Sequence, residues 1–410
     1  MVAPFPSMTN VGFAAILQPF GAQPVPGYEV RLYDPASNKV GGGGVGTLKF
    51  SWREHFQIQI KGFWAKTGLY MSPKSSAMRE MEHVEEFVLT SPDDLMLALI
   101  SSTDMLTHYH GDKATVPLLV EFSSRIEQLR RRHEELFGRP LRLVMLSDHG
   151  NAPQKVHRPG GIKRVLKDAG LRPAKQLEQP EDVITVTYGV VGYGVLYLDH
   201  QYAERAARAI LEHEGVRLAA WMTGDREMSL VSADGEARIN WRNGPPRRYL
   251  AYRAERGDPL RLLEIQARMA EAGLIDADGF ASRDDWFDWS AYGEFPDAPA
   301  RLVDSLDGTF VSNAATVIFS FEPGYAWGVK SAQVGAWLKA GRLEATHGGL
   351  DRESTWGFFL TSDPQVQEDG AVRADRALAR WADDGACTTA SVIHLGESAA
   401  WIHSPLVVDP

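Results

Sequence analysis

The sequence is poor in cysteine, in long apolar runs and in positive charge. Its single cysteine is Cys387, so no intrachain disulfide and no cysteine-based zinc site can form, and we expect a small apolar core residue there. No apolar run reaches the roughly 20 residues of a membrane-spanning helix, so no membrane span is expected. The first residues also lack the basic stretch that opens a signal peptide.

Acidic residues outnumber basic ones, 53 to 43, for a formal net charge of −10. We therefore expect no binding of duplex nucleic acid, which needs clustered positive charge. A phosphate ester substrate is not excluded, because a bound metal ion can outweigh the global charge locally. The apolar share of 44% and the charged share of 23% are typical of a globular protein with a packed core.

A strand–helix–strand unit is predicted in the first half of the chain. Residues 94–101 and 141–147 are short apolar runs bounded by turn signals, and residues 114–136 have the amphipathic pattern of a long helix. Such a unit predicts an α/β fold with a mostly parallel sheet and helices on both faces. Asp104 and Asp148 follow the two strands, so both should lie at the carboxyl edge of the sheet, where α/β proteins bind ligands.

The rest of the chain shows mixed patterns without an internal repeat. We interpret residues 1–174 and 301–410 as an α/β core and residues 175–300 as an inserted cap region. Asp234-Gly235 predicts a hairpin turn, and residues 340–361 are predicted as a final strand region. Further helices are predicted at 76–88, 201–213 and 259–272, and further strands at 183–190, 216–222 and 309–321.

Three clusters of acidic and imidazole side chains follow predicted strands. The first contains Asp104 and His108, the second contains Asp148 and His149, and the third is Thr346-His347-Gly348. Carboxylates and neutral imidazoles are good zinc ligands. One Asp-His-Gly tripeptide is usually only a turn, but three clusters at one edge of one sheet are hard to explain as coincidence. The sequence therefore predicts a metal site.

The order and spacing of these clusters resemble the metal ligands of the alkaline phosphatase superfamily, especially its phosphodiesterase/nucleotide pyrophosphatase branch. The segment 5–10, Phe-Pro-Ser-Met-Thr-Asn, is similar to the nucleophile segment of that branch. Gly27-Tyr28-Glu29 and Tyr33-Asp34-Pro35 resemble the stretch that follows it. The asparagine of that stretch is not matched, because Val30 or Arg31 stands in its place. The Cys/Ser-x-Pro-x-Arg motif of the sulfatase branch is absent.

The resemblance implies metal-dependent hydrolysis of phosphodiester or phosphate ester bonds in small molecules, through a covalent phosphothreonine intermediate. Thr9 matches the nucleophile, with Ser7 as the alternative, and Asn10 would stabilise the phosphoryl oxygens. Two divalent metal ions are implied, and zinc is expected. The implied ligands are Asp104, His108 and His347 for one ion, and Asp148 and His149, with Thr9, for the other.

One ligand of the family pattern has no counterpart, because its first-strand Asp precedes the nucleophile and no acidic residue precedes Thr9. Either a first strand, and any leader for export, has been lost from the start, or the second metal site is weakened. We favour the first explanation, because every later ligand type is present. Export from the cytoplasm stays open for the same reason. The alternative function is that of a non-catalytic or impaired member acting as a binding protein.

Overall fold

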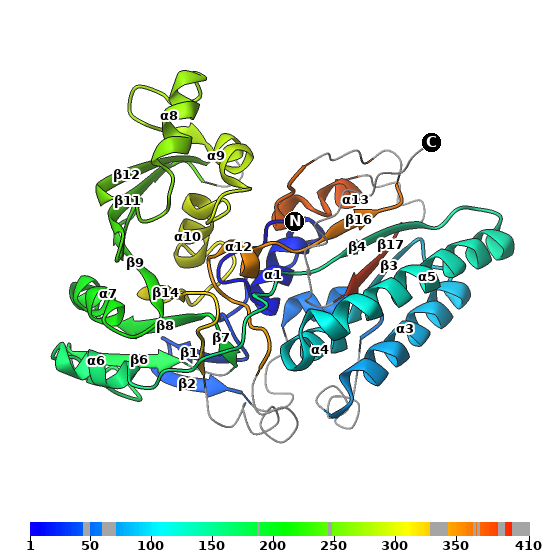
Figure 1. The fold of residues 1–410 in the computed structure, drawn as a ribbon, viewed down its shortest axis with the longest axis horizontal. Helices are drawn as coiled ribbons and strands as arrows, with labels where there is room; N and C mark the ends of the chain where they lie inside the picture. Colours follow the sequence, from blue (N-terminus) through cyan, green and yellow to red (C-terminus); the bar gives the residue numbers. More distant parts are fainter. Residues whose placement is uncertain are drawn as a thin grey trace.

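The computed structural model describes residues 1–43, 50–59, 71–186, 189–244, 248–328, 343–363, 366, 370–383 and 390–395. These residues form a mixed α/β fold around two large sheets, of four and nine strands (Figure 1). The predicted α/β class is therefore confirmed. Within the described ranges, no helix has the length and apolar character needed to cross a bilayer.

The elements lie as follows. The helices are α1 (Thr9–Ile16), α3 (Pro73–Thr90), α4 (Ser102–His110), α5 (Asp112–Phe137), α6 (Ile162–Asp168), α7 (Ala203–Leu211), α8 (Leu263–Glu271), α9 (Arg283–Ser290), α10 (Ala298–Leu306), α12 (Arg352–Thr355) and α13 (Ala379–Asp383). The strands are β1 (Arg31–Asp34), β2 (Lys39–Gly42), β3 (Leu95–Ile100), β4 (Arg142–Leu146), β5 (Arg172–Pro173), β6 (Asp182–Val186), β7 (Val190–Val191), β8 (Tyr193–Leu198), β9 (Val216–Gly224), β10 (Glu227–Ser232), β11 (Gly235–Arg242), β12 (Tyr249–Gly257), β13 (Ala281–Ser282), β14 (Val317–Phe321), β15 (Trp327–Gly328), β16 (Phe359–Thr361) and β17 (Ala390–Leu395).

The four-stranded sheet has the order β16-β4-β17-β3. Strand β17 pairs in parallel with both β3 and β4, whereas β16 is antiparallel to β4. The strands β3 and β4 are therefore parallel, as the strand–helix–strand pattern predicted, but a strand from the far end of the chain separates them. The long crossover between them runs through α4 and α5.

Alternating side chains of β3 face opposite layers of the structure. Met96, Ala98 and Ile100 pack against α3 and α5, whereas Leu97 and Leu99 belong to the core that contains α1. This alternation follows from the two-residue period of a strand. Helices consequently cover both faces of the four-stranded sheet (Figure 1).

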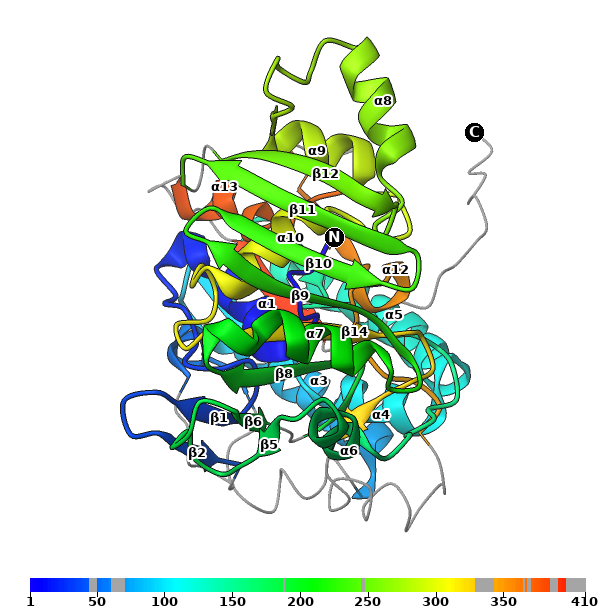
Figure 2. The same cartoon turned by 90° about the vertical axis from the view of Figure 1, so that its left-hand side faces the viewer.

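The nine-stranded sheet has the order β13-β12-β11-β10-β9-β14-β8-β6-β5, and Figure 2 shows it from its outer side. Its neighbours are antiparallel except for β5 with β6, because hairpins such as β10–β11 connect several of its strands. The prediction of a mostly parallel sheet thus describes only the four-stranded sheet. Strand β14 lies between β8 and β9, so this sheet crosses the boundary at residue 300, and the division into core and cap stays a prediction.

The segment before α1, and α1 itself, lie between the two sheets. Phe5 and Phe13 are fully buried in a core that also contains Val144 of β4 and Ile318 of β14. On the outer face of the larger sheet, α7 covers a separate apolar layer (Figure 2). The predicted nucleophile segment is therefore held by both sheets at once.

Two predicted strands were wrong in extent. In the range 309–321 only β14 is a strand, and in the range 340–361 the described residues form a loop, α12 and the short β16. Aromatic and β-branched residues in these ranges are buried, but they do not pair continuously with a neighbouring strand. Val311, for example, forms only an isolated bridge with Val25. Cys387 and residues 329–342 lie outside the described residues.

Candidate metal centre and nucleophile segment

Helix α4 places two of the predicted ligands on one face. It starts directly after β3, where the buried Glu80 carboxylate accepts hydrogen bonds from the N–H groups of Ser101 and Ser102, both at 3.0 Å. Asp104 and His108 are four residues apart, a spacing that aligns side chains along a helix. His108 Nε2 lies 3.0 Å from Asp104 Oδ1. Burial lowers the pKa of His108, but Asp104 and the carbonyl of Ala345 outweigh it, and the net pKa is raised.

The second pair follows the end of β4, and both of its side chains are fully buried. Asp148 Oδ2 lies 3.7 Å from His149 Nε2. Burial lowers the pKa of His149, although the nearby Asp148 opposes that shift. Gly150 comes next, where a Cβ would collide with the backbone carbonyls of Glu353 and Trp356. The glycine of this motif therefore lets α12 pack directly beneath the pair.

His347 lies between the other two imidazoles. Its ring stacks on that of His149, with centroids 4.1 Å apart, and tilts toward that of His108 at 5.1 Å. Backbone hydrogen bonds hold its loop, because Glu344 N–H donates to His108 O and Gly192 N–H donates to His347 O. Burial and the two neighbouring imidazoles lower the pKa of His347 well below its usual value. A neutral ring is the form that binds a metal ion.

Each of the three histidines has Nδ1 on a backbone carbonyl. The distances are 2.9 Å from His108 to Ala345 O, 2.8 Å from His149 to Gly150 O, and 2.9 Å from His347 to Ser7 O. A carbonyl only accepts, so Nδ1 carries the proton in each ring and Nε2 is the nitrogen that can face a cation. On His108 this Nε2 lies 3.0 Å from Asp104 Oδ1, and a bound cation would take the place of the proton between the two atoms. Fixing the tautomer in this way is the usual arrangement around metal-binding histidines.

Asp104, His108 and His347 bring their ligand atoms within 4.8 Å of one another. Two ligands of one zinc ion, at about 2.0–2.2 Å each, lie at most about 4.4 Å apart, so three atoms within 4.8 Å need only a small adjustment to share an ion. Across the part of the chain that the structure describes, no other set of three His, Cys, Asp or Glu side chains meets this spacing. No set that contains both Asp148 and His149 meets this spacing among the described residues.

The segment that carries Thr9 touches two of the clusters. Ser7 accepts the hydrogen bond from His347, and a Cβ on Gly12 would lie 3.0 Å from the Cβ and from the carbonyl oxygen of Asp148. Thr9, the half-buried first residue of α1, lies between these contacts. Asn10 is buried at the next position.

The hydroxyl of Ser7 is fully buried and engaged on several sides. It lies 3.2 Å from Gly349 O and 3.3 Å from Pro4 O, and it accepts a hydrogen bond from Arg301. A nucleophile needs an accessible hydroxyl, and Thr9 is the more exposed of the two candidates. These contacts favour Thr9 over Ser7.

No protein-family model matches the sequence, and no curated protein matches it. Among solved structures, the chain is similar to human ectonucleotide pyrophosphatase/phosphodiesterase 5, with 12% sequence identity and a TM-score of 0.46. The match covers 96% of this chain and 87% of the human one. At these values the match is a likeness only.

The sequence assigned no chemical role to Glu29, although Gly27-Tyr28-Glu29 was part of the family resemblance. Its carboxylate lines a cavity of about 20 Å³ with Tyr193 and Trp327. The pKa of Glu29 is raised to about 7, mainly by burial; the Val30 N–H opposes the rise and Asp104 adds to it. No sequence pattern could have found this residue, because only the fold brings Glu29 near enough to Asp104 for the two charges to interact.

Other polar residues near the motifs are exposed or bonded to other groups. His110 and Lys155 are exposed, His157 faces Glu214 at 3.5 Å, and Arg158 donates to the carbonyl of Gly328 at 2.8 Å. The contacts of His157 and Arg158 are therefore structural contacts outside the three clusters. Trp221, Trp241 and Trp286 are buried, and the half-buried Trp289 packs against the core.

Proposed function

We propose that the chain is a metal-dependent hydrolase of phosphodiester or phosphate ester bonds in small molecules. Asp104, His108 and His347 would hold one divalent cation, for which zinc suits the donor set. Asp148 and His149 would hold a second, together with the Thr9 hydroxyl. The six residues come from distant segments of the chain, which is why the proposal depends on the tertiary structure.

One observation carries the proposal. Asp104, His108 and His347 present ligand atoms within 4.8 Å, and both imidazoles donate Nδ1–H to carbonyls so that Nε2 is the ligand atom. A purely structural cluster has no need of three buried imidazoles in a row, because burying ionisable side chains costs free energy. A cation in their midst accounts for both the burial and the common tautomer.

Thr9 is the proposed nucleophile. Its oxygen would bond to phosphorus as the bond to the ester leaving group breaks, and water would then cleave the phosphothreonine and restore the hydroxyl. Divalent cations bound nearby would lower the pKa of the hydroxyl and balance the charge on the phosphoryl oxygens. Thr9 and Asn10 begin α1, and the N-terminal end of a helix favours an anion such as a phosphoryl group.

The test measures metal content and turnover on the same samples. The purified chain is loaded with zinc, its metal is counted by mass spectrometry, and hydrolysis of bis(4-nitrophenyl) phosphate and 4-nitrophenyl phosphate is followed. The ratio of the two rates decides between diester and monoester chemistry. In peptide mass spectra, quenched enzyme should carry phosphate on Thr9 with the monoester and 4-nitrophenyl phosphate on Thr9 with the diester.

The variant Thr9→Ala should lose at least about a thousandfold in kcat while it keeps its metal. Thr9→Ser, which retains a hydroxyl, should keep part of the activity, and Thr90→Ala on the exposed end of α3 serves as the matched control. A wild-type chain that neither retains zinc nor hydrolyses either ester would refute the proposal. Zinc retention without turnover would point to the binding-protein alternative.

A further inference from the structure

A buried arginine joins the nucleophile segment to the His347 loop. Arg301 projects from α10, is only 3% exposed, and donates to Ser7 Oγ at 3.2 Å and to Pro4 O at 3.4 Å. It also donates to Leu350 O at 3.1 Å and to Pro296 O at 3.0 Å. One rigid, planar group therefore spans both segments that carry the proposed chemistry, which a lysine with its single nitrogen could not do.

The contact continues through Ser7 to a proposed metal ligand. The hydroxyl of Ser7 that accepts from Arg301 is within hydrogen-bond distance of Gly349 O, and the carbonyl of Ser7 accepts from His347 Nδ1. Thr9 follows two residues later. A shift of Ser7 would thus move the nucleophile and rotate the imidazole together.

Arg301 is bound by carbonyls and a hydroxyl and not by carboxylates. Within the described residues it forms no ion pair. Burial lowers the pKa of Arg301 to about 9, although the charges of Asp297 and Asp351, at a longer distance, oppose this shift. Burying a guanidinium without a contacting carboxylate is costly. Such a placement is expected where geometry at a site matters more than stability.

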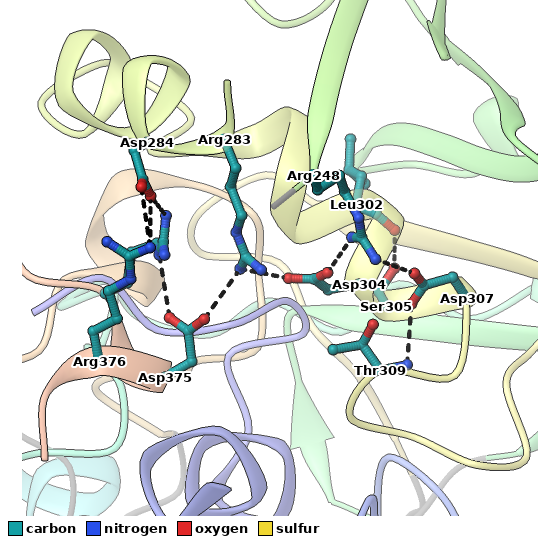
Figure 3. A network of polar contacts seen from close by, with 11 residues as sticks. Arg248, Arg283, Asp284, Leu302, Asp304, Ser305, Asp307, Thr309, Asp375 and Arg376 are labelled. Atoms are coloured by element: carbon teal, nitrogen blue, oxygen red, sulfur yellow. Dashed lines mark hydrogen bonds and ion pairs between the residues drawn. The ribbon is translucent and has the colours of Figure 1, made fainter. Parts of the chain in front are cut away.

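The rest of α10 is anchored by ion pairs that do not reach the site. Asp304, one turn after Arg301, bonds to both Arg248 and Arg283, and Arg283 also approaches Asp375 at 3.6 Å (Figure 3). Both contacts of Asp304 hold α10 against its neighbours. Arg248 is 2% exposed, so it matches Arg301 in burial but contacts neither Ser7 nor the His347 loop.

We infer that Arg301 is a positioning residue, which sets the Thr9 segment against His347 through Ser7 and Leu350. The inference rests on the proposed function for its role in turnover. Its effect on the ring of His347 follows from the hydrogen bonds alone and can be measured as metal affinity. The two consequences are therefore separable.

The experiment compares Arg301→Lys with Arg248→Lys, each folded at 25 °C and each characterised for thermal stability. Arg301→Lys should lower kcat by about 10- to 100-fold with little change in KM. It should also weaken zinc binding, measured by competition with a chelator, by about tenfold or more, because the group that orients a ligand histidine has been loosened. Arg248→Lys should lose stability while its zinc affinity and kcat stay within about twofold of wild type.

Ser7→Ala supplies the second variant, in case Arg301→Lys does not fold. It removes the hydroxyl between Arg301 and Gly349 but keeps the carbonyl that meets His347, so it should show a smaller loss of zinc affinity than Arg301→Lys. In a double-mutant cycle, the pair should lose little more than Arg301→Lys alone, because the two residues act through one contact.

Three results would overturn the inference. Arg301→Lys could bind zinc as tightly as Arg248→Lys does, Ser7→Ala could bind zinc like wild type, or the losses in the cycle could simply multiply. A wild-type chain that binds zinc but hydrolyses neither ester would refute the proposed function and still leave the zinc-affinity comparison to decide the role of Arg301.

Discussion

Adding one methyl group at Gly12 should lower turnover strongly while it changes stability only slightly. It lies in the fourth position of α1, and its Cα faces the turn that carries Asp148. Glycine inside a helix is unfavourable, so an alanine there would gain about 1 kcal/mol from helix propensity. A steric clash with Asp148 opposes that gain.

An alanine Cβ at residue 12 would lie 3.0 Å from both the Cβ and the carbonyl oxygen of Asp148. Carbon atoms in contact normally lie about 3.5–4.0 Å apart, so α1 and the Asp148 turn would have to separate by roughly half an ångström. Overpacking of this kind costs about 1–3 kcal/mol. After the propensity gain, Gly12→Ala should destabilise the protein by only about 0–2 kcal/mol.

The effect on turnover should be larger. Thr9 lies one helical turn before Gly12, and the displacement moves its hydroxyl relative to Asp148 and His149. Misplacing reacting groups by about 1 Å can cost a hundredfold in rate. We expect Gly12→Ala to lower kcat by about 10- to 100-fold, and Gly12→Val to lower both kcat and stability further.

The assay combines urea unfolding with hydrolysis of bis(4-nitrophenyl) phosphate at saturating zinc. Gly41→Ala is the control, because nothing lies within 4 Å of its added Cβ and the substitution should leave both readouts unchanged. Wild-type turnover in Gly12→Ala, at a free energy of unfolding raised by the full propensity gain, would refute the close contact between α1 and Asp148. A loss of turnover that appears only at limiting zinc and disappears at saturating zinc would instead place the damage in metal binding.

Two further predictions concern stability. The hydrogen bond from Arg172, helped by backbone N–H groups and opposed by burial, holds the pKa of Asp182 well below its usual range. Its contribution is present above the unfolded pKa of about 3.9 and is lost as the pH falls below it. Asp182→Asn should therefore lower the free energy of unfolding by about 1–2 kcal/mol at pH 7. Urea titrations at several pH values should show this difference from wild type shrinking as the pH falls, and a difference independent of pH would contradict the prediction. Gly150→Ala should cost about 3 kcal/mol, since its Cβ meets the carbonyls of Glu353 and Trp356, which belong to the backbone and cannot rotate away; a melting temperature within 2 °C or so of wild type, against the several degrees expected from that cost, would show that α12 is not packed there.

Local pattern was sufficient for much of the four-stranded half. The predicted helices at 76–88 and 114–136 correspond to α3 and α5, and the predicted strands at 94–101 and 141–147 correspond to β3 and β4. Their apolar residues recur with helical or strand period, and such repeats depend only on near neighbours. The ranges 309–321 and 340–361 failed because their apolar residues are buried by distant segments, which a local pattern does not record.

The sequence by itself determined which side chains could serve as ligands, and it contains the four-residue spacing of Asp104 and His108 that a helix aligns on one face. Only the tertiary structure decided that His347 lies between His108 and His149, that Ser7 binds its Nδ1, and that Arg301 holds Ser7. Those contacts arise where α1 is packed between two sheets. They join segments hundreds of residues apart, and no periodicity within a segment specifies its partner across a core.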